Sequence, residues 1–476
     1  MRRLTILLSA TVLGIAACNG SPVTPPQQPQ PPLATHEAFL DTLQERTFRF
    51  FWERAEPGNG LVPDRWPTPS FASVAAVGFG LAAYPVGIER SWISRSAGAD
   101  RVRTTLRFLW LAPQGPEATG TSGHHGLFYH FLDMRTGHRF ETVELSTIDT
   151  ALLMAGVLFC AEYFGGSDPA EAEIRALADS LYRRVDWTWM VRNSNRLSMG
   201  WRPESGYIPS EWHGYDEAMI LFILALGSPT HPVEPALWTT YTSTNSWGTH
   251  YGQPHVGFAP LFGHQYSHIF VDFRGIQDGY IRGRGIDYFE NSRRATLAQR
   301  AYAIANPMSW QGYDEYVWGL TASDGPADVT LPVNGMPRQF WTYAARGTSH
   351  TGTRDDGTLA PTALGGSVPF APAITIPALR TIRERYDAGI WGQYGFLDAF
   401  NPTFRWTDVP LRHGRLVQGM GWFDTDYLGI DQGPILLMIE NYRSEGVWKH
   451  MRRNPHVIRG LRRAGFSGGW LAAAGS

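Results

Sequence analysis

The stretch that decides the fold is Ser146-Thr-Ile-Asp-Thr-Ala-Leu-Leu-Met-Ala-Gly-Val-Leu-Phe-Cys-Ala-Glu-Tyr-Phe164. After a polar first turn, apolar residues cover every side of the helix that a run of this length predicts. A helix that is apolar all round must be buried among other elements. Three further segments have this character: Ser70–Tyr84, Tyr215–Leu226 and Gln432–Tyr442. The sequence therefore predicts several helices in the interior.

Segments with a single apolar stripe alternate with these apolar segments along the chain. They are Ala99–Leu111, Ala170–Val185, Ser292–Ala305 and Ile376–Tyr386. Such helices lie on the surface with the stripe against the core. Buried and surface helices in alternation predict an all-α fold of two concentric rings, an (α/α)-type toroid. We find no linker within residues 35–476, and so expect one domain there.

The amino-terminal segment predicts export and a lipid anchor. Two arginines precede the apolar run Leu4–Ala17, which is too short to cross a bilayer. The run ends at Cys18 in a sequence that resembles a bacterial lipobox, so we expect residues 1–18 to be a lipoprotein signal peptide with Cys18 lipidated. Asn19, in place of aspartate, favours the outer membrane, on its periplasmic or its surface face. An ordinary cleaved signal with an incidental cysteine is the alternative.

Composition narrows the class of partner. Residues 19–34 are rich in proline and predict an extended tether. The only other cysteine, Cys160, has no partner if Cys18 carries lipid, so the fold needs no disulfide. A net charge of -2 without a basic block argues against nucleic acid, and 13% aromatic residues fit a neutral saccharide. We expect a monomer without a cofactor.

Five carboxylates are candidates for catalysis. Four lie where an apolar helix is expected to begin: Glu144, Asp149, Glu217 and Asp431; Asp398 lies in a nearby motif of the same kind. Cleavage of a glycosidic bond needs one protonated carboxyl and one carboxylate. Helices that start on the same side of a toroid would bring such groups to one rim. The structural alternative is equally open, because acids in a first turn also cap helices and complement their dipoles.

Other residues are candidates for substrate contacts. They are Asp64, Arg65, His264, Tyr266, Trp310, Trp318, Trp422 and Tyr427. The aromatic members could stack on sugar rings or could belong to the core. His264, Tyr266 and His268 stand at alternate positions, but their spacing does not match that of a metal site, so we expect no metal.

Several strings resemble the bacterial glucoamylase-like family, which is similar to endo-β-1,2-glucanases and to the glucoamylase-like domain of cyclic β-1,2-glucan synthases. They are Ser73-Val-Ala-Ala-Val-Gly-Phe-Gly80, Tyr129-His-Phe-Leu-Asp133, Glu144-Leu-Ser-Thr-Ile-Asp-Thr150, Glu217-Ala-Met219, Leu226-Gly-Ser-Pro-Thr-His-Pro232, His264-Gln-Tyr-Ser-His268, Trp318-Gly-Leu-Thr-Ala322 and Ile439-Glu-Asn-Tyr442. The resemblance covers residues 39–466 and implies an (α/α)6 toroid and a metal-independent, inverting glycosidase. It also implies acids that act in catalysis or contact substrate among Glu144, Asp149 and Glu217. We assign Glu217 as general acid, with Asp398 and Asp431 in reserve.

Three functions remain open from the sequence. The first is an inverting hydrolase of a neutral β-glucan, most specifically an endo-acting enzyme on β-1,2-glucan. The second is a surface lipoprotein that binds glycans without catalysis. The third is a toroid polysaccharide lyase with Tyr266 as base and His264 beside it, which the near-neutral charge disfavours because lyases act on acidic sugars.

Overall fold

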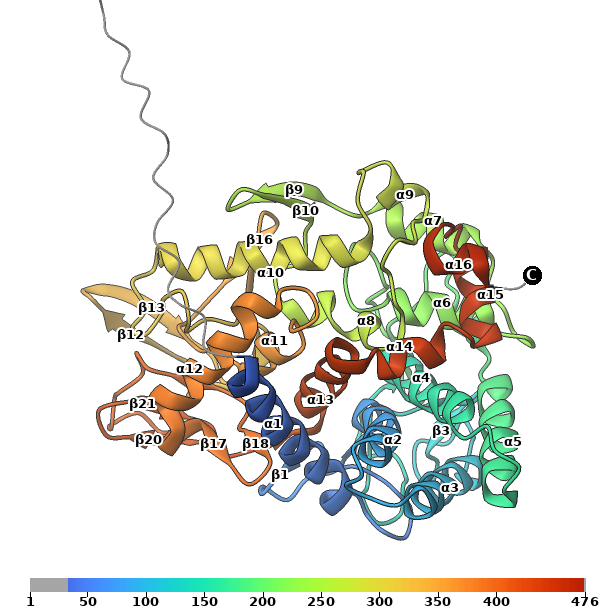
Figure 1. Cartoon of the computed structure of the whole chain (residues 1–476). Helices are drawn as coiled ribbons and strands as arrows, with labels where there is room; N and C mark the ends of the chain where they lie inside the picture. Colours follow the sequence, from blue (N-terminus) through green and yellow to red (C-terminus); the bar gives the residue numbers. More distant parts are fainter. Residues whose placement is uncertain (1–32, 475–476) are drawn as a thin grey trace, which may run out of the picture.

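The computed structural model describes residues 33–474, which fold into a helix-rich body (Figure 1). The chain segments predicted to be a signal peptide and, up to residue 32, a tether lie outside these residues. The last two residues assigned to the tether, 33 and 34, begin the first helix instead. Among the described residues, no helix has the length and apolar character to cross a membrane. Cys160 is buried as a free thiol.

Six helices are almost entirely buried. They are α2 (Val74–Glu89), α4 (Thr147–Tyr163), α6 (Met219–Gly227), α8 (Tyr266–Phe270), α11 (Pro361–Gly365) and α13 (Gly429–Ser444). Along the chain, α2 packs on α4, α4 on α6 and α6 on α8, while α13 packs on both α11 and α2. All four segments predicted to be buried helices overlap members of this set. The prediction of interior helices is therefore confirmed.

Longer helices with an exposed face alternate with the buried ones. They are α1 (Leu33–Arg54), α3 (Arg95–Leu111), α5 (Pro169–Arg184), α10 (Tyr288–Ala305) and α12 (Pro372–Ile390). Figure 1 shows α3, α5, α10 and α12 toward the outside of the body. The shorter helices are α7 (Ala236–Ser243), α9 (Gly279–Arg282), α14 (Gly446–Met451), α15 (Pro455–Arg463) and α16 (Gly469–Ala473).

Serine side chains fix where two of the buried helices begin. Ser73 Oγ accepts a hydrogen bond from Ala76 N at 3.3 Å, and Ser146 Oγ accepts one from Asp149 N at 3.3 Å. These N-caps satisfy amide groups that have no partner within the helix. As a result α2 begins at Val74, four residues later than the start of the predicted apolar segment.

Two glycines let α2 and α4 approach closely. A Cβ atom at Gly78 would lie 2.4 Å from the carbonyl oxygen of Leu152. A Cβ atom at Gly156 would lie 2.1 Å from the carbonyl oxygen of Gly78. Both obstacles are backbone atoms, so any larger residue at either position would push the helices apart.

Short antiparallel strands lead into the buried helices. β1 (Arg65–Trp66) pairs with β22 (Tyr427–Leu428), and β2 (Ala72–Ser73) pairs with β5 (Phe131–Leu132). A three-stranded sheet joins β6 (Leu145–Ser146), β7 (Gly200–Arg202) and β8 (Gly206–Tyr207). β2, β6 and β22 end where α2, α4 and α13 begin, so each of these helices starts directly after a paired strand.

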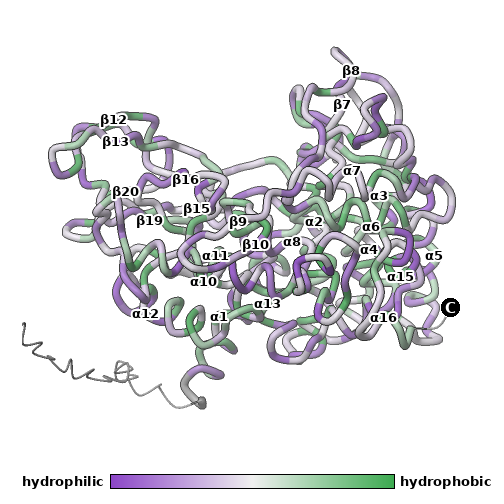
Figure 2. Tube along the Cα trace, turned by 90° about the horizontal axis from the view of Figure 1, so that it is seen from above, coloured by the Kyte–Doolittle hydropathy of each residue, from purple (hydrophilic) through white to green (hydrophobic). Residues whose placement is uncertain are grey.

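The remaining strands form hairpins and small sheets in the long connections. They are β3 (Gly123–His124), β4 (Leu127–Phe128), β9 (Trp247–His250), β10 (Gln253–Val256), β11 (Ala322–Ser323), β12 (Val329–Val333), β13 (Met336–Phe340), β14 (Ala344–Ala345), β15 (Gly347–Ser349), β16 (Gly352–Arg354), β17 (Trp391–Gly392), β18 (Gly395–Phe396), β19 (Phe400–Asn401), β20 (Arg415–Val417) and β21 (Gly421–Phe423). In Figure 2 the β7–β8 and β12–β13 hairpins project on the same side of the body, toward its two ends.

Candidate active site

The starts of three buried helices are tied together by backbone hydrogen bonds. Val74 N donates to His130 O at 3.2 Å, and His130 N donates to Glu144 O at 2.9 Å. Gly429 N donates to Asp64 O at 2.7 Å. The first turns of α2, α4 and α13 therefore lie on one rim of the bundle, as the spacing of the acids predicts.

His130 connects two of the predicted acids. Its Nδ1 lies 3.0 Å from Glu144 Oε1, and its Nε2 lies 3.6 Å from Asp149 Oδ1. Burial alone would lower the pKa of His130, but the charges of Asp149 and Glu144 raise it to about 9. The hydrogen bond with His130, assisted by the charge of Arg202, lowers the pKa of Glu144 to about 2. Glu144 is therefore ionised and His130 is an imidazolium at neutral pH.

Asp149 has one contact that fits a structural role at the start of α4 and one that fits a role in the site. Ser146 Oγ accepts from the amide of Asp149 and its hydroxyl donates to Asp149 Oδ2, which is the arrangement of a capping residue. The other carboxylate oxygen faces His130. Asp149 therefore holds Ser146, the N-cap of α4, and also faces His130.

Glu217 has the opposite electrostatic environment. Burial raises its pKa, and the negative charges of Asp216 and Asp149 raise it further. The turn that carries it is held by Ser267, whose hydroxyl donates to Glu217 O at 2.7 Å and whose Oγ accepts from Ile220 N at 2.9 Å. A carboxyl with a raised pKa in a fixed position can hold a proton near neutral pH.

A second group of acids surrounds Arg65. Arg65 Nη1 lies 2.7 Å from Asp324 Oδ2 and 3.6 Å from Asp426 Oδ2, and Arg65 Nε lies 3.4 Å from Asp64 Oδ2. Asp398 Oδ2 accepts a hydrogen bond from Asp324 N at 2.7 Å. One arginine thus faces several buried carboxyl groups, so this cluster contains more acidic groups than basic ones.

Burial protonates part of this second group. It raises the pKa of Asp398, with the charge of Asp431 as the next cause, and it raises the pKa of Asp424 and Asp431 as well. Asp398 Oδ1 and Asp424 Oδ2 are buried without a hydrogen-bond partner. Such oxygens can exchange hydrogen bonds with hydroxyl groups of a sugar.

Oxygens of Asp324, Asp398 and Asp424 lie within 4.8 Å of one another. Within residues 33–474 this is the acidic group with the spacing to ligate a metal ion. The spacing alone does not identify a metal site, because protonated carboxyls can lie equally close.

Two side chains, Tyr266 and His130, are affected by charges from both groups of acids. Burial raises the pKa of Tyr266, and the charges of Asp431, Glu217 and Asp149 add to this effect. Asp64 likewise contributes to the raised pKa of His130. Charges from both groups of acids therefore act on Tyr266 and His130.

Tyr343 lies over the second group. Its side chain is 57% exposed, and the charges of Asp431, Asp398 and Asp324 act on its hydroxyl. It belongs to the connection between β13 and β14, next to Trp341 and Arg346. An exposed aromatic ring beside carboxyl groups is a suitable contact for a sugar ring.

Several predicted contact residues lie in the core instead. Trp318 and Trp422 are 0% exposed, and Trp422 Nε1 donates to His413 O at 2.8 Å. Tyr427 is buried against Trp66. Of the two roles that the sequence left open for these rings, the structure supports the core role, because neighbouring residues bury all three side chains.

His264 and Trp310 also lie away from the acids. His264 is buried with Nε2 3.1 Å from Phe258 O, and burial lowers its pKa well below the ordinary value. It is therefore a neutral core residue and does not support the lyase assignment. Trp310 is buried and donates to Asp355 Oδ2 at 2.9 Å in a different cavity.

Sequence reasoning missed His130, Asp324, Asp424 and Tyr343. A signal existed for His130, which stands in the string Tyr129–Asp133, and for Asp424, which precedes a buried helix by a few residues. Asp324 and Tyr343 lie in a long connection with no periodic pattern. Their position could be known only from the folded chain.

Residues 209–455 match the family model Glycoamylase, described as "Putative glucoamylase". An exo β-1,2-glucooligosaccharide sophorohydrolase (non-reducing end) of Parabacteroides distasonis is 30% identical over 466 residues, which cover 90% of this chain. The match spans 58% of the length of that relative.

Solved structures are similar over nearly the whole chain. A "putative glucoamylase" from Bacteroides uniformis has a TM-score of 0.77 at 31% identity, covering 93% of this chain and 100% of its own. An endo-β-1,2-glucanase from Chitinophaga pinensis, solved with sophorotriose and glucose, has a TM-score of 0.77 at 29% identity, covering 91% and 99%. With a family model that matches more than half of its length, the chain belongs to the glucoamylase-like family.

Proposed function

We propose that the protein is a glycoside hydrolase that cleaves a neutral β-glucan, and specifically an endo-acting, inverting β-1,2-glucanase on an (α/α)6 toroid. The observation that carries this proposal is the opposite shift of two carboxyl groups that face one region. The pKa of Glu217 is raised by burial, while His130 lowers the pKa of Glu144 to about 2. One proton donor beside one carboxylate is the requirement for glycosidic cleavage.

In this mechanism Glu217 donates its proton to the glycosidic oxygen as the bond to the anomeric carbon breaks. A water molecule attacks that carbon from the opposite face and loses its proton to a carboxylate, for which we assign Glu144 with Asp149. The products are a new reducing end of inverted configuration and a free hydroxyl on the leaving sugar. His130 is a positioning residue, because its raised pKa makes it a cation that cannot accept a proton at neutral pH.

Asp398 and Asp431 are the second choice for the base. Asp398 lies in the β18–β19 turn, and Asp431 lies in the first turn of α13. Their raised pKa values favour a different task. As protonated or proton-sharing groups, they are suited to hold sugar hydroxyls. Asp64, Arg65, Tyr266 and Tyr343 complete the proposed substrate contacts.

The substrate is proposed from the named activities of similar proteins. Both a sophorohydrolase and an endo-glucanase that act on β-1,2-linked glucose are similar to this chain. The near-neutral net charge of the protein agrees with an uncharged glucan as substrate.

The experiment is product analysis with linear β-1,2-glucan, in parallel with β-1,3-, β-1,4- and α-1,4-glucans. We expect oligosaccharides of mixed length from β-1,2-glucan alone, and proton NMR should detect the α-anomer first. Release of sophorose only would change the assignment to an exo mode. Binding without cleavage of any glucan would contradict the hydrolase and support a glycan receptor.

We also propose that the chain is anchored to the outer membrane through Cys18, as a monomer. This proposal is supported by the sequence of residues 1–18 alone. Metabolic labelling with a fatty acid should mark the wild-type protein and leave Cys18→Ser unlabelled. Equal labelling of both would contradict the anchor.

A further inference from the structure

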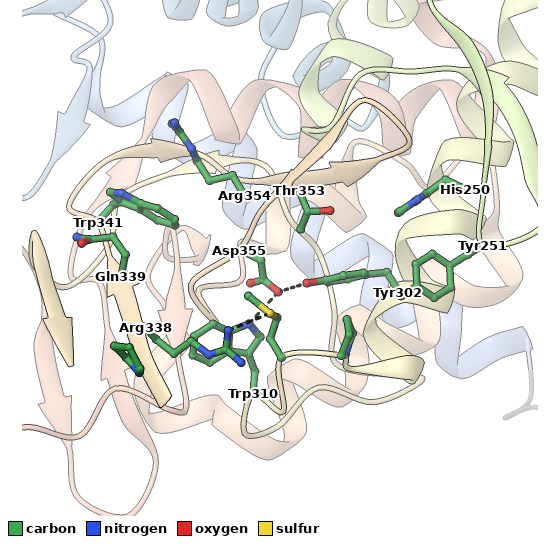
Figure 3. A pocket seen from close by; sticks show the side chains of 13 residues that line it. His250, Tyr251, Tyr302, Trp310, Arg338, Gln339, Trp341, Thr353, Arg354 and Asp355 are labelled. Atoms are coloured by element: carbon green, nitrogen blue, oxygen red, sulfur yellow. Dashed lines mark hydrogen bonds between the residues drawn. The ribbon is translucent and has the colours of Figure 1, made fainter. Parts of the chain in front are cut away.

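A cavity lined by none of the five predicted acids lies at one end of α10. It has a volume of about 560 Å³ and is formed by the end of α10, the β9–β10 turn and strands β13 and β16 (Figure 3). We call it the Asp355 pocket. Its residues include His250, Tyr251, Trp341, Arg338 and Arg354.

Asp355 forms the floor but has no capacity left for a ligand. Its Oδ2 accepts from Tyr302 Oη at 2.8 Å and from Trp310 Nε1 at 2.9 Å (Figure 3). Its Oδ1 accepts from Tyr313 Oη at 2.7 Å and from Gly357 N at 2.9 Å. The one carboxylate of the pocket is therefore fully occupied by the protein.

The two arginines of the pocket lack acidic partners. Within residues 33–474, no carboxylate forms an ion pair with Arg338 or Arg354. Arg338 Nε is buried without a hydrogen-bond partner, and its Nη1 reaches only Met308 Sδ at 3.3 Å. Arg354 lies over the ring of Trp341, 5.5 Å from its centroid. Guanidinium groups left in this condition favour an anionic ligand, above all a carboxylate or phosphate.

Two other polar side chains of the Asp355 pocket already form hydrogen bonds within the protein. Gln339 Oε1 accepts from Thr330 Oγ1 at 2.7 Å, and Gln339 Nε2 donates to Phe340 O at 2.5 Å. His250 Nε2 lies 2.8 Å from Thr348 Oγ1. The pocket thus offers donors in excess of acceptors, which distinguishes it from the carboxyl-rich region proposed for catalysis.

Aromatic rings and one shared loop connect this pocket to the acids. Tyr251 is 39% exposed, and Trp341 is half-buried at the start of the loop that places Tyr343 over the acids. Arg346 holds that loop, since its Nε and Nη2 lie 2.7 and 2.8 Å from the two oxygens of Asp356 and its Nη2 donates to Trp341 O at 3.0 Å. Trp341, which lines the pocket, and Tyr343, on which the charges of the acids act, thus belong to the same loop.

We propose that the Asp355 pocket binds a glucan unit that carries an acidic group, a carboxylate or a phosphate ester, while another part of the same chain occupies the proposed active site. The rings would contact the sugar, and Arg338 and Arg354 would bind the anion. This inference rests on the proposed function. It makes the enzyme selective for substituted chains of an otherwise neutral polymer.

The test is isothermal titration calorimetry of the full-length protein with Glu217→Gln, which prevents turnover. The probes are a linear β-1,2-gluco-oligosaccharide, the same oligosaccharide after partial succinylation, and free succinate. We expect the succinylated probe to bind about tenfold more tightly than the unmodified one at low salt. We expect Arg338→Ala with Arg354→Ala to remove this preference, so that the succinylated and the unmodified probe bind equally tightly.

Arg107→Ala is the matched control, because it removes a charge of the same sign from the exposed pair with Glu173 on α3 and α5. The preference should persist in this variant. Equal binding of both oligosaccharides, or a preference that survives the double substitution, would overturn the inference. Free succinate bound as tightly as the succinylated probe would overturn the claim that the ligand is a glucan.

Hydrolysis of the unmodified glucan by the wild-type protein tests the proposed function separately. If hydrolysis occurs without any preference for the substituted probe, only the inference about the pocket fails. Thermal unfolding of the double variant checks that the pocket still folds.

Discussion

At the scale of the residue, Glu217 and Glu144 show how one functional group acquires two roles. Glu217 lies among buried groups and near other negative charges, which favours the neutral form. Glu144 accepts a hydrogen bond from a cationic His130 and faces Arg202 3.3 Å away, which favours the charged form. For Glu217 the difference is made by burial and by its sequence neighbour Asp216. For Glu144 it is made by His130 and Arg202, which are distant in the sequence.

Replacement of the proposed acid gives the first prediction. Glu217→Gln should reduce kcat on β-1,2-glucan by about two to four orders of magnitude, because the amide cannot donate a proton to the leaving oxygen. The melting temperature should change little, since the amide is nearly isosteric. Glu173→Gln, on the exposed surface of α5, is the control and should keep full activity. Wild-type kcat in Glu217→Gln would remove this residue from the mechanism.

The neighbour of the acid gives the second prediction. Asp216→Asn removes a charge that raises the pKa of Glu217, while the amide oxygen can still accept from Tyr241 Oη and Ala218 N. Glu217 must be protonated to act, so activity is lost as pH rises through its pKa. A lower pKa moves the alkaline limb of the kcat profile to lower pH. An unmoved limb would mean that a different group donates the proton.

Sequence patterns predicted acids better than aromatic contacts. Glu144, Asp149, Glu217 and Asp431 were identifiable because each stands where an apolar run begins, and helix geometry then places them on one rim. No comparable rule separates Trp318, which is in the core, from Trp341, which lines a cavity. A tryptophan has similar neighbours in the sequence in both situations.

At the scale of the element, the buried helices were predictable when they were long. Ser146–Phe164 matches α4 to within one residue at each end, because its apolar run is continuous and Ser146 caps it. The five-residue helices α8 and α11 were not predicted, since one turn and a half gives no measurable period. The alternation of buried and surface helices could therefore be inferred from the sequence, but not the positions of all the buried helices.

The contact of α2 with α4 gives the third prediction. Gly156→Ala should lower the free energy of unfolding by about 1–3 kcal/mol, since the new Cβ would clash with the backbone of Gly78. Alanine has the better helix propensity, so the sign of the effect reports packing. Urea denaturation measures the change.

Gly165→Ala is the matched control for this helix pair. It lies just beyond the end of α4, and no atom lies within 4 Å of the position that the alanine methyl would take, so we expect a change below about 0.5 kcal/mol. Equal destabilisation by both substitutions would show that close packing of the two helices is not the cause.

At the scale of the whole molecule, the concentration of buried acids makes stability depend on pH. The carboxyls with raised pKa are Asp216, Glu217, Asp398, Asp424 and Asp431. In the folded state they bind protons that the unfolded chain releases near pH 4. Their contribution to stability is therefore present at low pH and is lost as pH rises through the folded pKa values.

The fourth prediction is a fall in melting temperature between about pH 6.5 and pH 8. The pKa of Asp216 and Asp431 is raised to about 7 and that of Glu217 to about 8, so over this range the folded chain holds protons that the unfolded chain has already lost. His130, with its pKa raised to about 9, acts in the same direction. Buried histidines with lowered pKa, such as His255 and His268, have the opposite sign but act below about pH 6.5. Asp398→Asn should flatten the fall, and Asp100→Asn on the exposed side of α3 should not. A melting temperature that stays constant would contradict the protonated state of the acids.

The pairing of β1 with β22 determines when, during synthesis, the region of the acids can form. Arg65 is aligned with Leu428, and Gly429 N donates to Asp64 O, so the region of the acids needs both ends of the chain. During synthesis β1 is made early, but its partner strand β22 is made only near the end of translation. A ribosome-bound or truncated chain that stops before residue 427 would lack both the partner strand of β1 and helix α13, which packs on α2. We expect it to be inactive until these elements are made.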